Sequence, residues 1–349
     1  MTSRPVVNIS RAALIVAFAF LSVLIIPPTK PARAQSKSPT TAAAPFLLVL
    51  NKIENTLAII EPAKMSVVAR VPTGEGPHEV ITSADGRTAY VANYGAQKPG
   101  NSLSVIDLEA RKEIKRVELG PLMRPHGMVE AGGKIYFTAE VNRAVARYNP
   151  QTGTVDWMMG TGQNGTHLLC VTPDEKRIYT ANIGSDSVTV IEFNAAPPAP
   201  SKITHISVGK QPEGLDLSPD GRELWVGHNG DGGVSIIDTA TNSVKETIKV
   251  GKVPIRLKFT PDGKRVLISD PERHELAVFD AATRKEVKRL QVGEVPVGIL
   301  VTPDGKLAFV ATMQAGRVVS IKLEDLSIAG QVEPGKGPDG LGWTAARKN

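Results

Sequence analysis

Short apolar runs separated by turn sequences recur along residues 45–343 of the chain. Runs such as TAYVAN at 88–93 and LSVIDL at 103–108 are rich in β-branched and aromatic residues, and turns such as SADGR at 83–87 lie between them. Asp-Gly and Gly-Gly pairs tolerate the positive φ of tight hairpins, and no stretch holds a convincing helical period. The pattern therefore predicts an all-β chain of short antiparallel strands.

A unit of four such runs repeats along the chain, and each unit opens on a short phrase that usually contains proline. Successive phrases lie 41 to 48 residues apart. They are GPHEVI at 76–81, RPHGMV at 124–129, GTHLLCV at 165–171, QPEGLDL at 211–217, VPIRLKF at 253–259, VPVGILV at 295–301 and GPDGLGW at 337–343. A period near 42 residues with four strands per unit is typical of a β-propeller blade.

The two ends of the repeat region complement each other. Residues 46–72 hold three strands without a first strand, and residues 338–343 supply a first strand alone. We therefore expect a seven-bladed β-propeller of four-stranded blades whose last blade pairs these two segments, because such closure leaves no exposed edge. The expected organisation is a signal peptide, a flexible segment, one propeller domain and a tail, at 1–34, 35–44, 45–343 and 344–349.

The basic charge of the chain is concentrated at its N-terminus. Residues 1–34 carry four basic and no acidic residues, an apolar run at 12–26, and an Ala-x-Ala ending at Ala34. We expect a Sec-type signal peptide cleaved after Ala34, since 15 helical residues span about 22 Å, less than the ~30 Å hydrocarbon core. The alternative is an uncleaved anchor.

Removal of this segment changes what the charge implies. The formal charge falls from +6 to +2, with 37 basic and 35 acidic residues left. We therefore expect a periplasmic or secreted monomer with no membrane span after cleavage, whose partner is a small molecule or a periplasmic protein rather than nucleic acid. The single cysteine, Cys170, excludes an intramolecular disulfide and a Cys-rich metal module.

Several phrases resemble a known repeat family. The strand ends YVAN at 90–93 and YTAN at 179–182, with the Pro-x-Gly and Pro-Asp-Gly-Lys phrases, resemble the YVTN-type β-propeller repeat family over almost the whole mature chain. One blade, at 124–153, is similar to streptogramin lyase-like propellers. The resemblance implies the fold, and says less about function because one fold hosts many chemistries.

Two sets of residues are expected at one mouth of the central channel, because the first strand of a blade begins where the second strand ends. The first set follows the proline of each phrase and comprises His78, His126, His167, Glu213, Ile255, Val297 and Asp339. The second set ends each second strand and comprises Asn51, Asn93, Glu140, Asn182, His228, Asp270 and Thr312. Three of the six histidines thus occupy one place in three consecutive blades.

These residues predict a site at the channel mouth. His78, His126 and His167 could hold one divalent metal ion, or each could donate to a neighbouring backbone carbonyl. The residues expected to bind ligand are Asn93, Asn182, Glu213, Arg256, Asp270 and Asp339. Arg256 could bind an anion, or pair with Glu213 or Asp270. We expect neither haem nor nucleotide, because a single cysteine cannot form a c-type haem site and no Walker loop or Rossmann fingerprint is present.

Three functions remain open at this point. The first is an exported propeller that binds a small ligand, a metal or a protein partner at the channel mouth. The second, implied by the resemblance to propeller lactonases and lyases, is metal-assisted lactone hydrolysis or elimination in which Glu140 or His228 moves the proton. The third is a non-catalytic scaffold or nucleic-acid-binding module. Whether the protein is an enzyme is left undecided by its sequence.

Overall fold

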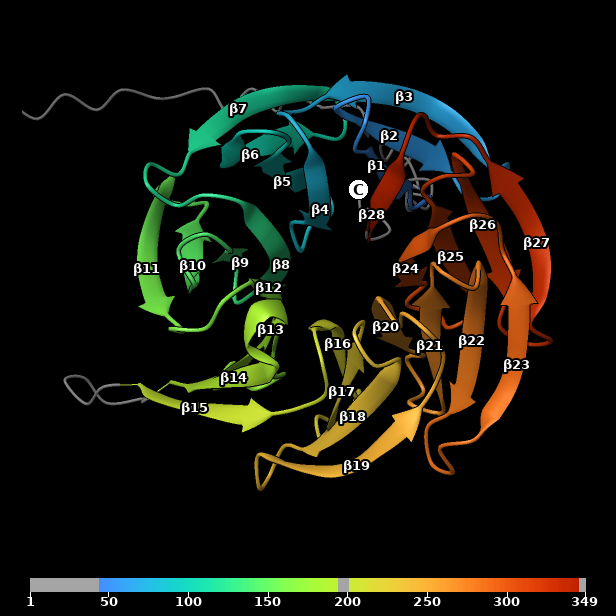
Figure 1. Ribbon diagram of the computed structural model, residues 1–349. Coiled ribbons are helices and arrows are strands. Elements are labelled where there is room, and N and C mark those ends of the chain that lie inside the picture. The colour runs from blue at the N-terminus through green and yellow to red at the C-terminus, as the bar shows by residue number, and fades with distance from the viewer. Residues whose placement is uncertain (1–43, 194–200, 345–349) are drawn as a thin grey trace, which may run out of the picture. The chain divides into compact units, whose positions relative to one another are not determined.

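The computed structural model describes residues 44–193 and 201–344. All of them belong to one compact unit, residues 41–349. The described residues form seven antiparallel sheets of four strands each, which follow one another around a ring (Figure 1). The predicted signal peptide and most of the predicted flexible segment lie outside the described residues, as do residues 345–349 of the tail.

The strands follow the chain blade by blade. Blade one is β4 (Pro77–Thr82), β5 (Thr88–Gly95), β6 (Pro99–Asp107) and β7 (Lys112–Glu118), and blade two is β8 (Pro125–Ala131), β9 (Lys134–Ala139), β10 (Ala144–Asn149) and β11 (Thr154–Gly160). Blade three is β12 (Thr166–Val171), β13 (Arg177–Asn182), β14 (Ser187–Glu192) and β15 (Lys202–Ser207), with the short 3₁₀ helix η1 (Ile183–Ser185) between β13 and β14. Blade four is β16 (Pro212–Leu217), β17 (Glu223–His228), β18 (Gly233–Asp238) and β19 (Ser243–Lys249).

The remaining blades complete the ring. Blade five is β20 (Arg256–Phe259), β21 (Arg265–Asp270), β22 (Glu275–Asp280) and β23 (Glu286–Gln291), and blade six is β24 (Pro296–Val301), β25 (Leu307–Thr312), β26 (Arg317–Lys322) and β27 (Ser327–Val332). Blade seven is β28 (Pro338–Trp343), β1 (Leu47–Asn51), β2 (Thr56–Glu61) and β3 (Ser66–Pro72). The predicted all-β, seven-bladed fold is confirmed.

Blade seven closes the ring as the sequence predicts. Strand β28, the last strand of the described chain, pairs antiparallel with β1, the first, and Leu47 lies opposite Trp343. Beyond the strands, the Phe46 amide donates to the Thr344 side chain at 2.7 Å, and the Thr344 amide donates to the Phe46 carbonyl at 3.0 Å. The innermost strand of each blade contacts that of the next, and β28 contacts β4 (Figure 1). Closure thus joins the two ends of the described chain.

The predicted hairpin turns join the first and second strands of most blades. In the TPDGK turn at 260–264, the Thr260 hydroxyl donates to Asp262 at 2.6 Å, and the same carboxylate accepts the Lys264 amide at 3.0 Å. Gly263 has a φ of +70°, a left-handed conformation that glycine adopts without strain. The turn therefore forms from its own side chains, which explains why it recurs.

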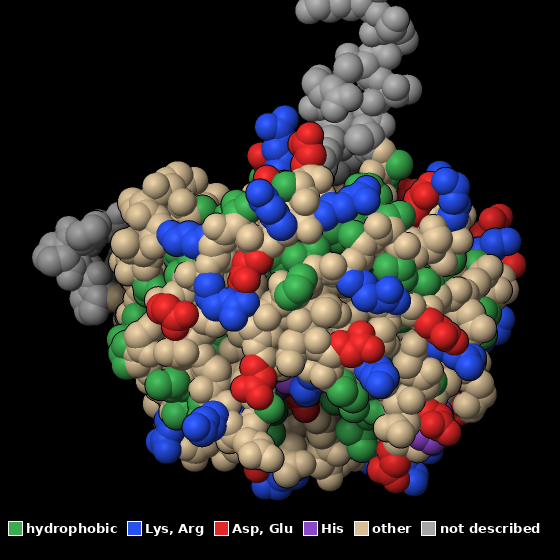
Figure 2. All heavy atoms as spheres, turned by 90° about the horizontal axis from the view of Figure 1, so that it is seen from above, with side chains coloured by type: hydrophobic (Ala, Val, Ile, Leu, Met, Phe, Trp, Pro, Cys, Tyr) green, Lys and Arg blue, Asp and Glu red, His purple; other side chains and the backbone are tan. Residues whose placement is uncertain are grey.

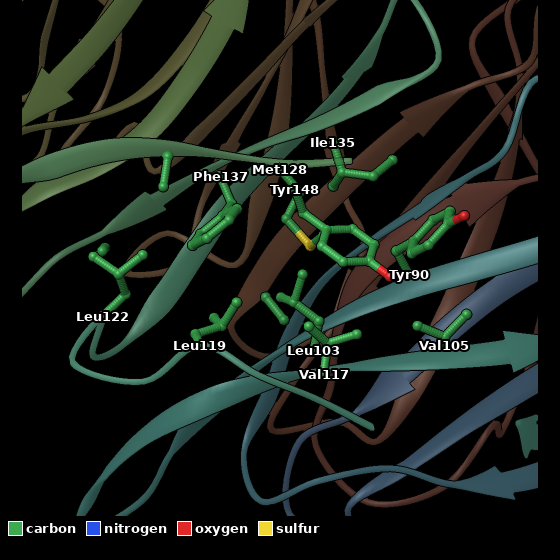
Figure 3. Close-up of a cluster of buried hydrophobic side chains, with 13 residues drawn as sticks. Tyr90, Leu103, Val105, Val117, Leu119, Leu122, Met128, Ile135, Phe137 and Tyr148 are labelled. Atoms are coloured by element: carbon green, nitrogen blue, oxygen red, sulfur yellow. The ribbon is translucent and has the colours of Figure 1, made fainter. Parts of the chain in front are cut away.

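The hydrophobic core lies between neighbouring blades. Figure 3 shows one such cluster, in which Tyr90 and Leu103 of blade one pack against Phe137 and Tyr148 of blade two. Phe137 is fully buried, and burying such a side chain contributes roughly 1.5–3 kcal/mol. Similar clusters lie between the other blades, so the ring is held by side chains from both faces of every sheet.

Two surface properties bear on the expected partners. Within residues 44–193 and 201–344, no helix is long and apolar enough to cross a bilayer. On the face shown in Figure 2, basic and acidic side chains are interspersed.

Candidate ligand-binding site

A cavity of about 290 Å³ lies among the innermost strands and the loops at one mouth of the channel. All seven blades contribute to its lining at or just before their first strands, and three blades add residues at or just after the ends of their second strands. The residues are Lys52, His78, Tyr94, His126, His167, Glu213, Ile255, Arg256, Val297, Met313 and Asp339. The structure therefore brings together the whole first set, His78, His126, His167, Glu213, Ile255, Val297 and Asp339.

Three histidines form a stack along one wall. The ring centroids of His126 and His167 lie 3.7 Å apart at an interplanar angle of 32°, and those of His78 and His126 lie 4.6 Å apart. The Tyr94 ring meets His78 edge-on at 4.6 Å. The stack forms because each imidazole sits second in β4, β8 and β12, after Pro77, Pro125 and Thr166. Equal positions in consecutive blades point the same way.

His167 lies between two carboxylates. Its Nδ1 is 3.1 Å from Glu140 Oε2, and its Nε2 is 3.4 Å from Glu213 Oε1. Burial alone would lower the pKa of His167, but the interactions with Glu140 and Glu213 outweigh it and raise the pKa to about 9. The Tyr94 hydroxyl donates to the same Glu140 oxygen at 3.1 Å. At neutral pH the His167 imidazole is therefore a cation held by two anions.

Arg256 joins two blades across the channel. One terminal nitrogen donates to Glu213 and the other to Glu79, each at 3.1 Å, and the Arg256 side chain is only 12% exposed. Burial would raise the pKa of Glu213, yet His167 and Arg256 hold it at about 2. Of the two alternatives for Arg256, the ion pair with Glu213 is present, and Glu79 is a partner that sequence reasoning missed.

His78 and Lys52 both approach Asp339. His78 Nδ1 lies 3.2 Å and Lys52 Nζ 3.8 Å from Asp339 Oδ2. Burial would raise the pKa of Asp339, but the neighbouring His78, Arg256 and Lys52 lower it to about 2. Asp339 is thus a buried anion whose nearest nitrogen belongs to His78.

His126, the middle imidazole, differs from its neighbours. It is 1% exposed and, unlike His78 and His167, has no carboxylate within salt-bridge distance in the described chain; its Nδ1, like that of His78, has no hydrogen-bond partner there. Burial, followed by the nearby His167 and His78, holds the pKa of His126 well below its usual 6.5. The ring is therefore neutral, with one nitrogen able to accept and one able to donate. Buried polar groups without partners are rare in proteins, so this ring requires an explanation.

The predicted ligand residues at the ends of the second strands lie outside the cavity lining. Asn93 and Asp270 instead accept hydrogen bonds from the loop that leads into the first strand of their own blade. The Gly74 amide donates to Asn93 at 3.0 Å, and the Lys252 amide donates to Asp270 at 2.6 Å. A Cβ on Gly74 or Gly251 would overlap the side chain of Asn93 or Asp270. Asn182 likewise holds the strand that follows it, through hydrogen bonds to Ser187 and Thr189.

The two predicted proton carriers are separated. His228 is buried in blade four, where its Nε2 accepts from the Gly209 amide at 3.3 Å and its Nδ1 lies 3.2 Å from Asp231. Glu140 does not line the cavity, but its Oε2 lies 3.1 Å from Nδ1 of His167, which does. The difference follows from strand register, because Pro125 faces Ala139 just as Pro77 faces Asn93. Glu140 is therefore one residue beyond the second set, and one residue reverses the direction of a side chain.

That one-residue offset explains the lining residues that sequence reasoning missed. Each of the missed lining residues directly follows a member of the second set: Lys52 follows Asn51, Tyr94 follows Asn93 and Met313 follows Thr312. Successive side chains of a strand point in opposite directions, so this alternation could have indicated that the residue after each member of the second set faces the cavity.

Comparisons with known proteins were made for the whole chain. The family profile of the cytochrome D1 heme domain matches residues 162–312, less than half of the chain. No curated protein matched.

Solved structures match the fold over most of the chain. A putative 6-phosphogluconolactonase from Bacteroides fragilis has a TM-score of 0.73 at 16% identity, covering 88% of this chain and 100% of its own. A periplasmic gluconolactonase from Pseudomonas aeruginosa has a TM-score of 0.70 at 18% identity, covering 86% and 99%. Kuenenia stuttgartiensis hydrazine synthase has a TM-score of 0.69 at 18% identity, covering 83% and 99%. These matches establish the propeller fold; the YVTN resemblance stays a prediction.

The expected cofactor, a divalent ion with neither haem nor nucleotide, is contradicted by the match to a heme domain and by the likeness to hydrazine synthase. The arrangement of the three histidines also argues against a divalent metal ion. The three imidazoles stack with their planes tilted by 32° and 38°, His167 gives both nitrogens to carboxylates, and the described residues contain no group of three His, Cys, Asp or Glu arranged to hold a metal. His126 has the chemistry of an axial haem ligand.

The size of the cavity decides the fit to haem. Pockets for drug-sized ligands measure about 300–1,000 Å³, and a haem is larger than most such ligands. At about 290 Å³, the mouth cavity does not fit an intact haem in this conformation.

Proposed function

We propose that this chain is an exported YVTN-type propeller that binds a small polar molecule in the mouth cavity. The observation that carries the proposal is His126, a neutral, buried imidazole whose Nδ1 has no hydrogen-bond partner among the described residues, in a cavity lined by charged, aromatic and apolar side chains. Leaving such a group unsatisfied costs about 1–3 kcal/mol. A ligand that hydrogen-bonds to the His126 ring repays this cost, which favours a binding site over a purely structural cluster.

The electrostatics favour binding over proton abstraction. A general base works best when its pKa lies near the working pH. Here the pKa of Glu213 is about 2, and that of Glu140 is lowered as well, because burial is outweighed by hydrogen bonds with His167 and other neighbours. His167 is already protonated at neutral pH, with its pKa at about 9. These groups bind and orient polar atoms, but they are poor proton acceptors.

A second candidate, the opening of a lactone, is supported by one further observation. Protonated His167 and Arg256 flank Glu213 on one wall, and cationic donors fixed in a cavity can stabilise the oxyanion of acyl transfer. In this version His167 and Arg256 are the candidate catalytic residues, with Glu140 positioning His167. His228 has no part in it, because it does not line the cavity.

Thermal-shift screening of the purified protein tests the binding proposal. A panel of small acids, sugars, lactones and amines is compared between the natural chain and His126→Leu, with His205→Leu as the matched control. His205 is an exposed histidine on the outer strand β15. We expect at least one compound whose stabilisation disappears in His126→Leu and persists in His205→Leu. Shifts that are identical in all three proteins, or absent from all, overturn the proposal.

The lactone version and export have their own tests. Lactone turnover that falls at least about 100-fold in His167→Gln would support catalysis, and a panel without turnover refutes it.

Export is tested by N-terminal sequencing of protein from the periplasm, where we expect Gln35 as the first residue. Retention of residues 1–34 would contradict the cleaved signal peptide.

A further inference from the structure

A second cavity of about 420 Å³ lies in the central channel, lined by the first strands of all seven blades. Pro173 and Pro219, in the turns that follow β12 and β16, belong to its lining. His167 and Glu213, near the starts of the same two strands, line the mouth cavity instead. The second cavity therefore occupies the opposite end of the channel, and we name it the turn-side chamber.

The Arg256 bridge lies between the two cavities. Arg256 lines both of them, whereas Glu213 belongs to the lining of the mouth cavity and Glu79 to that of the turn-side chamber. Arg256 donates to each of these carboxylates at 3.1 Å. The turn-side chamber is thus a separate space, and its chemistry can be considered independently of the mouth cavity.

The charges in the lining of the turn-side chamber are paired with one another. They belong to two anions and two cations, Glu79, Asp216, Arg256 and Lys258. Arg256 pairs with Glu79 at 3.1 Å, and Lys258 Nζ donates to Asp216 at 3.0 Å. The second oxygen of Asp216 accepts the Phe259 amide at 2.8 Å. An ionic ligand would therefore have to compete with one of these pairs.

The rest of the lining is apolar. Among the described residues that form it, Ser218 and the Cys170 thiol are the only uncharged polar side chains. Ile81, Leu168 and Leu341 line the chamber and are only half-buried, although their strands lie innermost in the ring (Figure 1). Because the first strands form the wall of the channel, the exposed parts of these side chains face the chamber. Apolar surface is thus left open to water there.

Cys170 adds to this apolar wall. Burial, with a smaller contribution from Asp216, raises the pKa of its thiol. The thiol is therefore neutral at physiological pH, and a neutral cysteine packs as a small hydrophobic side chain.

We propose that the turn-side chamber binds a small, uncharged apolar molecule, such as an aromatic hydrocarbon. This inference goes beyond the proposed function of the mouth cavity and does not depend on it. Such a ligand removes apolar wall from water, which is favourable in proportion to the area covered. An apolar cavity of about 150 Å³ binds benzene, so about 420 Å³ leaves room for a substituted ring. A charged analogue would lose its hydration without gaining a free counter-charge.

Isothermal titration calorimetry with three probes of similar shape tests the ligand class. Toluene is neutral and apolar, benzoate is an anion, and benzylammonium is a cation. We expect toluene to bind at least about tenfold more tightly than either ion. Equal or tighter binding of benzoate or benzylammonium, or no binding of toluene up to its solubility limit, overturns the proposal.

One variant places the ligand in the chamber. Val129 lines it from blade two, and Val129→Phe fills part of the space, so we expect the affinity for toluene to fall at least about tenfold. Val287→Phe is the matched control, because Val287 is 48% exposed on the outer strand β23; it should bind toluene like the natural chain. Toluene affinity that is unchanged in Val129→Phe, or that falls only in His126→Leu, overturns the proposal, since the latter would place toluene in the mouth cavity.

The natural chain offers a second measurement that needs no variant. Cys170 is the single cysteine of the sequence and lines the turn-side chamber, so its alkylation by N-ethylmaleimide reports on this space. We expect saturating toluene to slow the alkylation at least about fivefold, and benzoate at the same concentration to leave the rate unchanged. Equal rates with and without toluene overturn the proposal, even if Val129→Phe does not fold.

Discussion

Replacing Arg256 by methionine removes the only charged group that contacts both Glu79 and Glu213 among the described residues. The methionine side chain fills much of the same space without its charge. After the change, Glu79 has no cation within salt-bridge distance in the described chain, and Glu213 keeps only His167. Two anions then remain close together in a largely buried layer of the channel.

The magnitude follows from how deeply the pair is buried. Removing one partner of a buried ion pair costs about 3–5 kcal/mol, because the other charge stays buried and uncompensated. Arg256 is 12% exposed and Glu213 is 14% exposed, so this range applies. We expect Arg256→Met to lower the free energy of unfolding by about 3–5 kcal/mol, and Tm by roughly 5–15 °C.

Urea unfolding followed by tryptophan fluorescence measures this change, since Trp225 is fully buried against Phe259. Arg116→Met is the matched control. Arg116 pairs with Glu113 at 2.8 Å on the outer strand β7, where its side chain is 40% exposed, and exposed pairs contribute no more than about 1 kcal/mol. A second variant, Arg256→Met with Glu79→Gln and Glu213→Gln, removes the stranded charges and should recover part of the stability.

Two results would refute this reasoning. One is a loss of stability in Arg256→Met that is no larger than in Arg116→Met. The other is a triple variant no more stable than Arg256→Met, which would mean that the packing of the arginine, rather than its charge, stabilises the channel.

Three further predictions concern stability. The pKa of His167 is raised from 6.5 to about 9, so its ion pairs stabilise the fold fully below pH 6.5 and are lost as the pH rises to about 9. The free energy of unfolding should fall by about 3 kcal/mol over this range, and a flat profile, or an equal fall in His167→Gln, contradicts this. Asp270→Ala removes the acceptor of the Lys252 amide and should cost about 1.5–3 kcal/mol in urea unfolding without changing ligand affinity; a change in affinity alone would instead place Asp270 in the binding site. Phe137→Ala, in the core of Figure 3, should cost about 3–5 kcal/mol, against less than about 0.5 for the exposed Ile328→Ala, and equal losses would refute the packing argument.

Much of the fold could be predicted because each blade is specified by short-range patterns. The hairpin at 260–264 forms from its own threonine, aspartate and glycine, and continuous apolar runs such as that of β25 form strands that are buried on both faces. The missing first strand at 46–72 indicated the pairing of β1 with β28. Repetition also placed His78, His126 and His167 at equal positions, so their convergence followed once the ring was known.

The functions of the second set could not be predicted in the same way. Asn93 lies near the end of β5 and Asp270 ends β21, yet their side chains bond to the entering loops and do not line the cavity. The residues that directly follow members of the second set, Tyr94 after Asn93 and Lys52 after Asn51, line the cavity instead. A strand reverses its side chains at every residue, so an offset of one position exchanges a loop-binding residue for a cavity-lining one.

By itself, the sequence of this protein determined the number of blades, the closure of the ring and the set of histidines at one mouth, since all of these depend on repetition along the chain. Only the tertiary structure decided which charges meet across the channel. Arg256 bonds to Glu79, 177 residues away, and His78 lies 3.2 Å from Asp339 of the neighbouring blade. Such pairs depend on the curvature of the ring and on the register of each strand, and both are set by packing between blades that no local pattern records.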